Sequence, residues 1–285
     1  MNRQRNAWGA DQLRTVPGPG LRATVSAERG AKIVSLRDDA GHEWLAQPAG
    51  WRPPARPGAA FVESDMAGWD ECAPTIVAGQ PSGWPAVPDH GDLWDVAWAE
   101  DGEALRGHSR SLDVELVRTI RACRRGLRIE YRARPAVAGT PFLWAAHPQF
   151  TAPPGSRVAI DVSEVIDVLH EPGRRQSWTE DRATIDAVPL GHCAKYYAPP
   201  EVPIGRADLT VPDRGTLTMT WNAIVAPYLG LWFDHGVYAR EPVIAIEPST
   251  GYFDSLAAAM RSDRVLYLHP DSPAQWAIEL SVTAP

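Results

Sequence analysis

The sequence predicts an all-β protein, a large antiparallel β-sandwich. Short apolar or alternating segments recur along the whole chain, and no segment has the 3.6-residue periodicity of a long amphipathic helix. The 27 Pro and 23 Gly among 285 residues indicate many turns between these segments. Neither a dividing linker nor a solenoid repeat is evident, so we expect one sandwich domain over residues 1–285.

Composition excludes several function classes. The net charge of -7 and the absence of a basic stripe argue against nucleic-acid binding, which needs concentrated Lys and Arg. Three widely spaced Cys without a CxxC pair argue against a disulfide framework or a zinc knuckle. The N-terminus has no secretory signal, and no apolar run reaches 18 residues, so we expect a cytoplasmic protein that does not contact membranes. We expect no metal or cofactor, and the oligomeric state stays open.

The first half of the chain alternates between strands and loops. Residues 21–25 and 31–36 read as two strands joined by a turn, and a second turn leads to a short strand at 43–45. Residues 46–60 are rich in Pro, Gly and Ala and predict a loop, with Trp51 as an anchor or a site wall. Residues 105–109, 112–120 and 127–134 follow as antiparallel strands. The first group indicates the opening of a β-meander, and the later three segments, joined by short turns, indicate an antiparallel sheet.

The second half continues the pattern. Strands are expected at 142–150, 158–162, 165–169, 217–221, 228–233, 243–247, 265–268 and 275–283, with a short helix at 254–261. The last strand alternates without interruption through Trp276, Ile278, Leu280 and Val282.

Two polar and aromatic blocks stand out between these strands. Residues 64–75 fit neither the helical nor the strand period and predict a loop. Loops on a β scaffold are where binding and catalytic sites are commonly built. Residues 89–94 form the second block. The blocks contribute the candidate substrate-binding residues Trp69, Asp70, Glu71, Asp89 and Trp94. Their carboxylates could bind a cation, although the spacing matches no EF-hand, and solvated loop carboxylates are the alternative.

Two apolar strands each end in a polar residue before Pro. Glu247 follows the run 243–246 and precedes Pro248, and His147 follows a similar run and precedes Pro148. A Glu at the end of a core strand must find partners or bear a desolvation cost. The shared geometry would place both side chains at the same rim of a sheet, as a base and an acid for proton transfer. A strand-end Glu paired with an Arg is the alternative.

The remaining signals are weaker. His90, between Asp89 and Gly91, is a further candidate, whereas an isolated His usually has a structural role. Trp144 beside His147 offers a flat aromatic face for a sugar, with core packing as the alternative. No nucleophile elbow, P-loop or Rossmann motif is found, and paired carboxylates also keep a glycosidase open.

These segments, taken in order, resemble the aldose 1-epimerases, the galactose mutarotase-like superfamily. The resemblance is carried by residues 30–36 (GAKIVSL), 89–94 (DHGDLW), 144–148 (WAAHP), 246–251 (IEPSTG) and 276–280 (WAIEL). It spans nearly the whole chain. It implies a β-sandwich of the supersandwich type with an open cleft for a small-molecule carbohydrate.

The resemblance also implies roles. Glu247 matches the general base that takes the proton from the anomeric hydroxyl, His147 the general acid that protonates the ring oxygen, and His90 a second histidine that contacts the sugar. The family's substrate-binding Arg has no clear match. Its hydroxyl-binding Asp is not assignable either, and Lys195 lies in about that region.

Two other functions remain open at this point. The first is a carbohydrate-binding or sensor protein on the same fold, without turnover. The second is a hexose-phosphate epimerase, for which Arg174 and Arg175 form the available basic pair. A lyase or glycosidase on a related sandwich is a further possibility.

Overall fold

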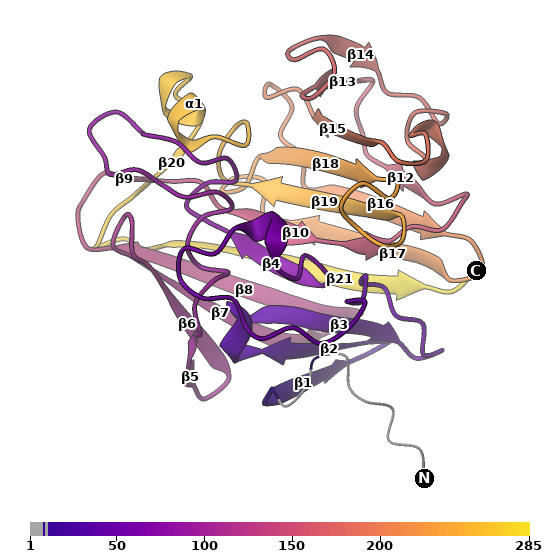
Figure 1. Ribbon diagram of the computed structural model, residues 1–285, viewed down its shortest axis with the longest axis horizontal. Helices are drawn as coiled ribbons and strands as arrows, with labels where there is room; N and C mark the ends of the chain where they lie inside the picture. The colour runs from indigo at the N-terminus through magenta and orange to yellow at the C-terminus, as the bar shows by residue number, and fades with distance from the viewer. Residues whose placement is uncertain (1–7, 9–10) are drawn as a thin grey trace.

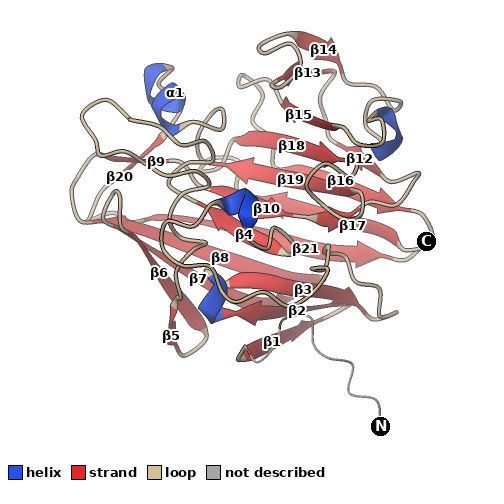
Figure 2. Cartoon of the chain, in the orientation of Figure 1, coloured by secondary structure: helices blue, strands red, loops and turns tan. Residues whose placement is uncertain are grey.

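Two antiparallel sheets pack face to face in the computed structural model, which describes residue 8 and residues 11–285 (Figures 1 and 2). The first sheet runs in the order β1 (Leu13–Gly18), β2 (Leu21–Ser26), β3 (Lys32–Asp38), β4 (Trp69–Cys72), β10 (Ala145–Pro148), β19 (Val243–Ser249), β18 (Tyr228–Asp234), β15 (Cys193–Tyr197), β13 (Glu164–Asp167), β14 (Arg175–Ser177). Its eleventh strand, β11 (Phe150–Thr151), also pairs with β19. The predicted all-β sandwich is therefore confirmed.

The second sheet has eight strands. Its order is β12 (Arg157–Ala159), β16 (Arg206–Val211), β17 (Gly215–Trp221), β21 (Ala274–Thr283), β8 (Gly126–Pro135), β7 (Val114–Cys123), β6 (Ala104–Ser109), β5 (Ala99–Asp101). A two-stranded ladder joins β9 (Thr140–Phe142) to β20 (Leu266–Leu268). The helical elements are α1 (Leu256–Arg261) and the 3₁₀ turns η1 (Ala27–Arg29), η2 (Phe61–Glu63) and η3 (Ile185–Ala187). No helix in the described part of the chain is long and apolar enough to cross a membrane.

The core lies between the two sheets and follows from the alternation of each strand. In β17 and β7, every second side chain is buried against the facing sheet, as a period of two requires. Large aromatic side chains fill the space between the sheets, among them the completely buried Trp44, Trp69, Trp144, Phe150 and Phe233. Such a dry, close-packed layer fixes the sheet that carries the site.

Three local predictions were wrong. Residues 69–72, expected within a loop, form β4 in the middle of the first sheet, where all four residues are buried. The single strand expected over 142–150 is divided into β9, β10 and β11. Residues 43–45 form isolated bridges to Arg37 and Phe150 instead of a strand.

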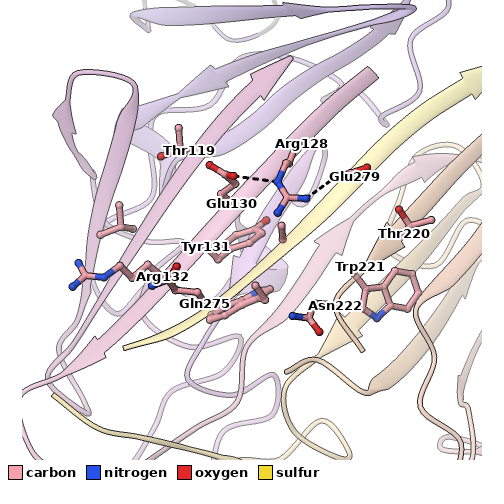
Figure 3. Close-up of a pocket in the computed structure, with 13 residues that line it drawn as sticks. Thr119, Arg128, Glu130, Tyr131, Arg132, Thr220, Trp221, Asn222, Gln275 and Glu279 are labelled. Atoms are coloured by element: carbon pink, nitrogen blue, oxygen red, sulfur yellow. Dashed lines mark hydrogen bonds and ion pairs between the residues drawn. The ribbon is translucent and has the colours of Figure 1, made fainter. Parts of the chain in front are cut away.

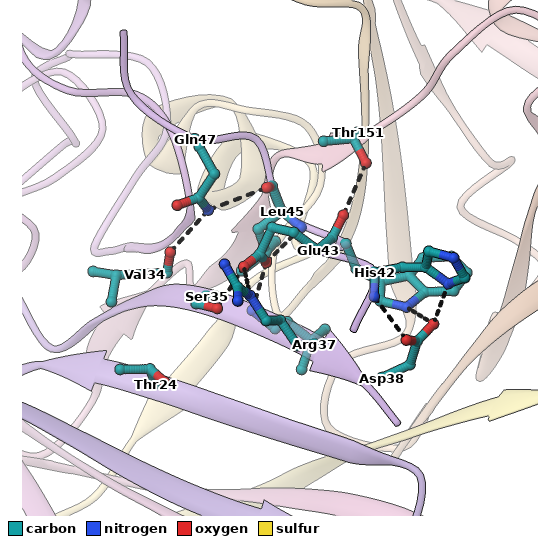
Figure 4. Close-up of polar contacts among 12 residues, drawn as sticks. Thr24, Val34, Ser35, Arg37, Asp38, His42, Glu43, Leu45, Gln47 and Thr151 are labelled. Carbon is teal, nitrogen blue, oxygen red and sulfur yellow. Dashed lines mark hydrogen bonds and ion pairs between the residues drawn. The ribbon is translucent and has the colours of Figure 1, made fainter. Parts of the chain in front are cut away.

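The short connection after β3 is held by side chains in place of a ladder (Figure 4). The Glu43 carboxylate accepts hydrogen bonds from the Leu36 amide at 2.8 Å and from Arg37 Nε at 3.1 Å. The Asp38 carboxylate accepts from the His42 amide at 2.9 Å, with His42 Nδ1 at 3.0 Å, and from Trp44 Nε1 at 3.2 Å. These bonds satisfy the backbone where strand pairing stops.

Candidate active site

A cavity of about 300 Å³ lies over the central strands of the first sheet, on the face away from the second sheet. Strands β10, β19, β18 and β15 supply its floor, and five connecting segments supply its walls. The residues around it are Phe61, Val62, Met66, Ile76, Val77, Asp89, His90, His147, Gln149, Leu169, Lys195, Trp232, Tyr238, Glu247 and Asp254. Half of the predicted site residues are thus brought together: Glu247, His147, His90, Asp89 and Lys195.

His147 and Glu247 face each other across adjacent strands. The register pairs Ala145 with Ser249 and Phe150 with Ile244, which sets His147 directly opposite Glu247. His147 Nε2 lies 3.9 Å from Glu247 Oε1. The expected shared rim was wrong, because β19 continues through Pro248 to Ser249 and the pair sits inside the sheet. An interior position holds both side chains more rigidly than a strand end would.

One oxygen of Glu247 is engaged and the other is not. Lys195 Nζ donates to Oε2, whereas the buried Oε1 has no hydrogen-bond partner within the described part of the chain. Lys195 Nζ also lies 3.4 Å from Asp254 Oδ1, which accepts a 2.6 Å hydrogen bond from the Tyr197 hydroxyl. An unsatisfied buried carboxylate oxygen is costly, and it points to a ligand proton as its partner.

Burial shapes the protonation of the pair. It raises the pKa of Glu247 above its ordinary value of 4.5, against the opposing charge of Lys195. Burial, with the positive fields of His90, Lys195 and Lys32, lowers the pKa of His147 well below 6.5. Burial also opposes the charge of Lys195, but Asp254 and Glu247 outweigh it and raise the pKa of Lys195 above 10.5. Shifted proton donors and acceptors in one cavity are typical of an active site.

His90 is placed by a strained turn. Its φ of 56° lies in the left-handed region, and a Cβ at the neighbouring Gly91 would meet the Ala73 carbonyl oxygen at 1.9 Å. The His90 ring stacks on Phe61 at 3.8 Å, and its Nδ1 lies 2.8 Å from Asp89 Oδ2. The ring centroids of His90 and His147 are 5.5 Å apart, so both imidazoles reach the same space.

Gly230 leaves the room that the charged cluster occupies. It lies opposite Glu247 on β18, and Tyr197 lies opposite Gly230 on β15. A Cβ at this position would meet Glu247 Oε2 at 3.1 Å and Lys195 Cε at 3.4 Å. A glycine in a strand interior here marks a close approach of functional side chains.

The other predicted site residues do not line this cavity. Successive side chains of β4 point to opposite faces, so Trp69 and Glu71 face the second sheet and are completely buried. Glu71 bonds to Arg118 on β7, Tyr131 on β8 and Trp144. Glu71, Trp69 and Trp144 are therefore core residues, which corrects their expected contact with substrate.

Asp70 and Trp94 lie near the cavity without lining it. Asp70 is on the site-facing side of β4, opposite His147, and its Oδ2 lies 3.0 Å from Lys32 Nζ. Trp94 is buried with its ring edge-on to Phe61 at 5.0 Å. Trp51 is exposed and is absent from the walls of the site. These three expectations of a direct role are not supported by the placement.

Sequence reasoning missed several residues around the cavity. Asp254 was read only as the start of a helix, and Phe61, Gln149, Trp232 and Tyr238 were not singled out. Trp232 lies opposite Lys195 in the register of β18 and β15. Its place beside the cavity could therefore be inferred from that of Lys195 only once the pairing of these two strands was known.

A larger hollow of about 620 Å³ lies on the outer face of the second sheet (Figure 3). Three of its charged side chains are paired with one another: Arg128 lies between Glu130 at 3.1 Å and Glu279 at 2.6 Å. This pattern is that of a solvated sheet face, and it offers no buried unsatisfied carboxylate. The smaller cavity is the better candidate.

Comparison with solved structures supports this choice of fold. The Slr1438 protein of Synechocystis sp. PCC 6803 matches with a TM-score of 0.73 and 17% identity, over 99% of this chain and 100% of that one. A galactose mutarotase-like protein from Lactobacillus casei matches with a TM-score of 0.66 and 16% identity, over 95% of this chain and 100% of that one. A galactose mutarotase related enzyme from Lactobacillus acidophilus matches with a TM-score of 0.65 and 13% identity, over 96% of this chain and 98% of that one.

The fold is the galactose mutarotase-like fold. At these identities the likeness establishes architecture, and the site must be argued from its own residues. No family model and no curated protein matches the sequence. The resemblance stated from the five sequence segments is thus confirmed at the level of the fold.

Proposed function

We propose that this protein is an aldose 1-epimerase-like isomerase that interconverts the α and β anomers of a sugar. One observation carries the proposal: Glu247 Oε1 is buried, unpartnered and 3.9 Å from His147 Nε2 on the floor of a sugar-sized cavity. The two oxygens on an anomeric carbon lie closer together than this, so one base and one acid can reach both from the same side.

The reaction needs only proton transfers. Glu247 accepts the proton of the anomeric hydroxyl, the bond between C1 and the ring oxygen breaks, and C1 becomes a carbonyl carbon. His147, in its protonated form, donates a proton to the departing ring oxygen; its lowered pKa makes this form scarcer at neutral pH but a stronger acid. Rotation about C1–C2 and reclosure, with both transfers reversed, give the other anomer. Effective acid and base groups must be positioned within hydrogen-bond reach of these oxygens.

Lys195 supports the base. By holding Oε2, it directs Oε1 toward the cavity and favours the ionised carboxylate. Asp254 shares Lys195 through Oδ1 and can accept from a sugar hydroxyl through its other oxygen, Oδ2, while Trp232 offers an aromatic face at the wall.

A phosphorylated substrate is less favoured. Arg174 pairs with Glu171, Arg175 pairs with Glu164 and Glu201, and neither Arg lines the cavity. Lys195, the one Lys among the described residues around the cavity, is engaged by two carboxylates. A phosphate group would need an available cluster of cations.

Anomer exchange in freshly dissolved aldoses tests the proposal, followed by polarimetry or by NMR of the anomeric protons. We expect Glu247→Gln to lower the rate by about 10²- to 10⁴-fold. Glu279→Gln, on the exposed outer face, is the matched control and should leave the rate unchanged. An undiminished rate in Glu247→Gln contradicts the proposal. Binding by calorimetry without any exchange would instead favour a sugar-binding or sensor protein.

A further inference from the structure

Exposed hydrophobic side chains gather at the mouth of the cavity, in contrast to its charged floor. Val62, Val77, Leu169 and Tyr238 line the opening, and each is between 44% and 58% exposed. Glu247 and His147 on the floor are buried. We call these four side chains the apolar rim.

Among the hollows of the described chain, the four side chains occur together around this cavity, and two of them, Val62 and Tyr238, also line a neighbouring hollow. Of the eleven large hydrophobic side chains exposed in the described part of the chain, four belong to the apolar rim. They come from four separate segments: η2, the loop at 73–78, the loop after β13 and the loop after β18. Scattered exposed hydrophobics need no explanation, but a ring of them around one opening indicates a contact surface.

The floor fixes the direction of a bound sugar. A pyranose whose anomeric and ring oxygens meet Glu247 and His147 would turn the opposite side of its ring, C3 and C4, toward the mouth, with the C6 branch on C5 at the edge between floor and mouth. A free aldose carries hydroxyls at these positions, and the rim side chains Val62, Val77 and Leu169 have no polar atom to meet them. Asp89, which is also exposed at the mouth, is engaged by His90. Desolvating unpaired hydroxyls is unfavourable.

We infer that the substrate is a monosaccharide with a deoxygenated carbon or a small apolar substituent, such as an O-methyl or acyl group, on the half of the ring opposite the anomeric carbon. The inference rests on the proposed function and names its substrate class. The cavity volume of about 300 Å³ is at the low end for ligand sites, which fits one ring and a small substituent.

The test compares kcat/KM for anomer exchange within matched pairs of sugars. The probes are D-glucose against 6-deoxy-D-glucose and 3-O-methyl-D-glucose, and D-galactose against 6-deoxy-D-galactose. Burial of one methylene-sized group predicts a preference of about fourfold or more for at least one modified sugar. Saturation-transfer NMR should show its methyl protons in contact with the protein.

Rim variants make the test specific. The isosteric changes Val62→Thr and Val77→Thr, combined with Leu169→Asn, should bring the ratio of kcat/KM for the modified sugar to that for its parent down toward one. Val137→Thr, an equally exposed valine away from the cavity, should leave it unchanged. An active protein that prefers the parent sugars in every pair overturns the inference but leaves the proposed function standing. If exchange is absent and the methyl contacts persist, the proposed function fails while the apolar recognition holds.

Discussion

The buried ion pair between the sheets gives the most quantitative prediction. Glu71 on β4 receives hydrogen bonds from Arg118 Nη1 at 2.7 Å, Tyr131 OH at 3.0 Å and Trp144 Nε1 at 2.6 Å. The side chains of Glu71 and Arg118 have no exposed surface. In Glu71→Gln, the Arg118 charge stays buried without a counter-ion.

Removing one partner of such a buried pair costs about 3–5 kcal/mol. This is a large part of the free energy of unfolding of a folded domain, which is about 5–15 kcal/mol. Arg118→Met and Glu71→Leu, the two single changes of a double-mutant cycle, should each cost at least a similar amount. The double variant Glu71→Leu with Arg118→Met removes both charges but strands Tyr131 OH and Trp144 Nε1, at about 1–3 kcal/mol each. We therefore expect the double variant to have a lower free energy of unfolding than the parent, but to lose less than the sum of the losses in the two single variants.

Equilibrium unfolding in urea, followed by circular dichroism, measures these free energies. Glu115→Gln is the control, because Glu115 is an exposed carboxylate on β7, the strand that also carries Arg118, and surface ion pairs contribute little to stability. A cost below about 1 kcal/mol for Glu71→Gln, or strictly additive single and double changes, would refute the reasoning. The folded fraction of Glu71→Gln should retain the pH profile of anomer exchange, since Glu71 does not reach the cavity.

Two further predictions concern protonation. The charge of Lys195 lowers the pKa of both Glu247 and His147. Lys195→Met should therefore raise both pKa values, move the pH optimum of anomer exchange upward and lower the rate. A pH profile of kcat/KM measures this shift, and an unchanged or lower optimum speaks against the roles proposed for the two residues. Burial opposes ionisation of Asp38, but hydrogen bonds from His42 and Trp44 prevail and lower the pKa of Asp38 below 3.8. Asp38 therefore contributes stability above pH 3.8 that is lost as the pH falls through its folded pKa. Asp38→Ala should cost about 1–3 kcal/mol at pH 7 and less at pH 3, and an equal cost at both would contradict the linkage.

The sequence predicted the fold because most strands alternate. Apolar and polar residues of β17, β7 and β21 recur with a period of two, which only a sheet satisfies. Strand β4 escaped this test because it carries Asp70 and Glu71 in the middle of the sheet. Each carboxylate there is paired with a cation that is distant in the sequence, Lys32 on the neighbouring strand β3 or Arg118 on the facing sheet, and no local pattern can indicate such a partner.

The candidate site was predictable only in part for a related reason. Glu247 and His147 each stand out locally, as polar residues within apolar runs. Their contact depends on the register between β10 and β19, which are almost 100 residues apart in the sequence. Phe61, Trp232 and Tyr238 look like ordinary hydrophobic residues until the fold gathers them around one cavity.

Under the proposed function, the position of Glu247 inside the sheet would separate catalysis from specificity. Its backbone is fixed by strands on both sides, so the carboxylate keeps its direction whatever the loops do. The desolvation cost of this position is offset through Oε2 by Lys195, for which Gly230 leaves room. Oε1 is left for the substrate. The rim, in contrast, lies on four loops, which tolerate substitution more readily than sheet interiors. Changes of rim residues should therefore alter which sugar is accepted while the pair that moves the protons stays intact.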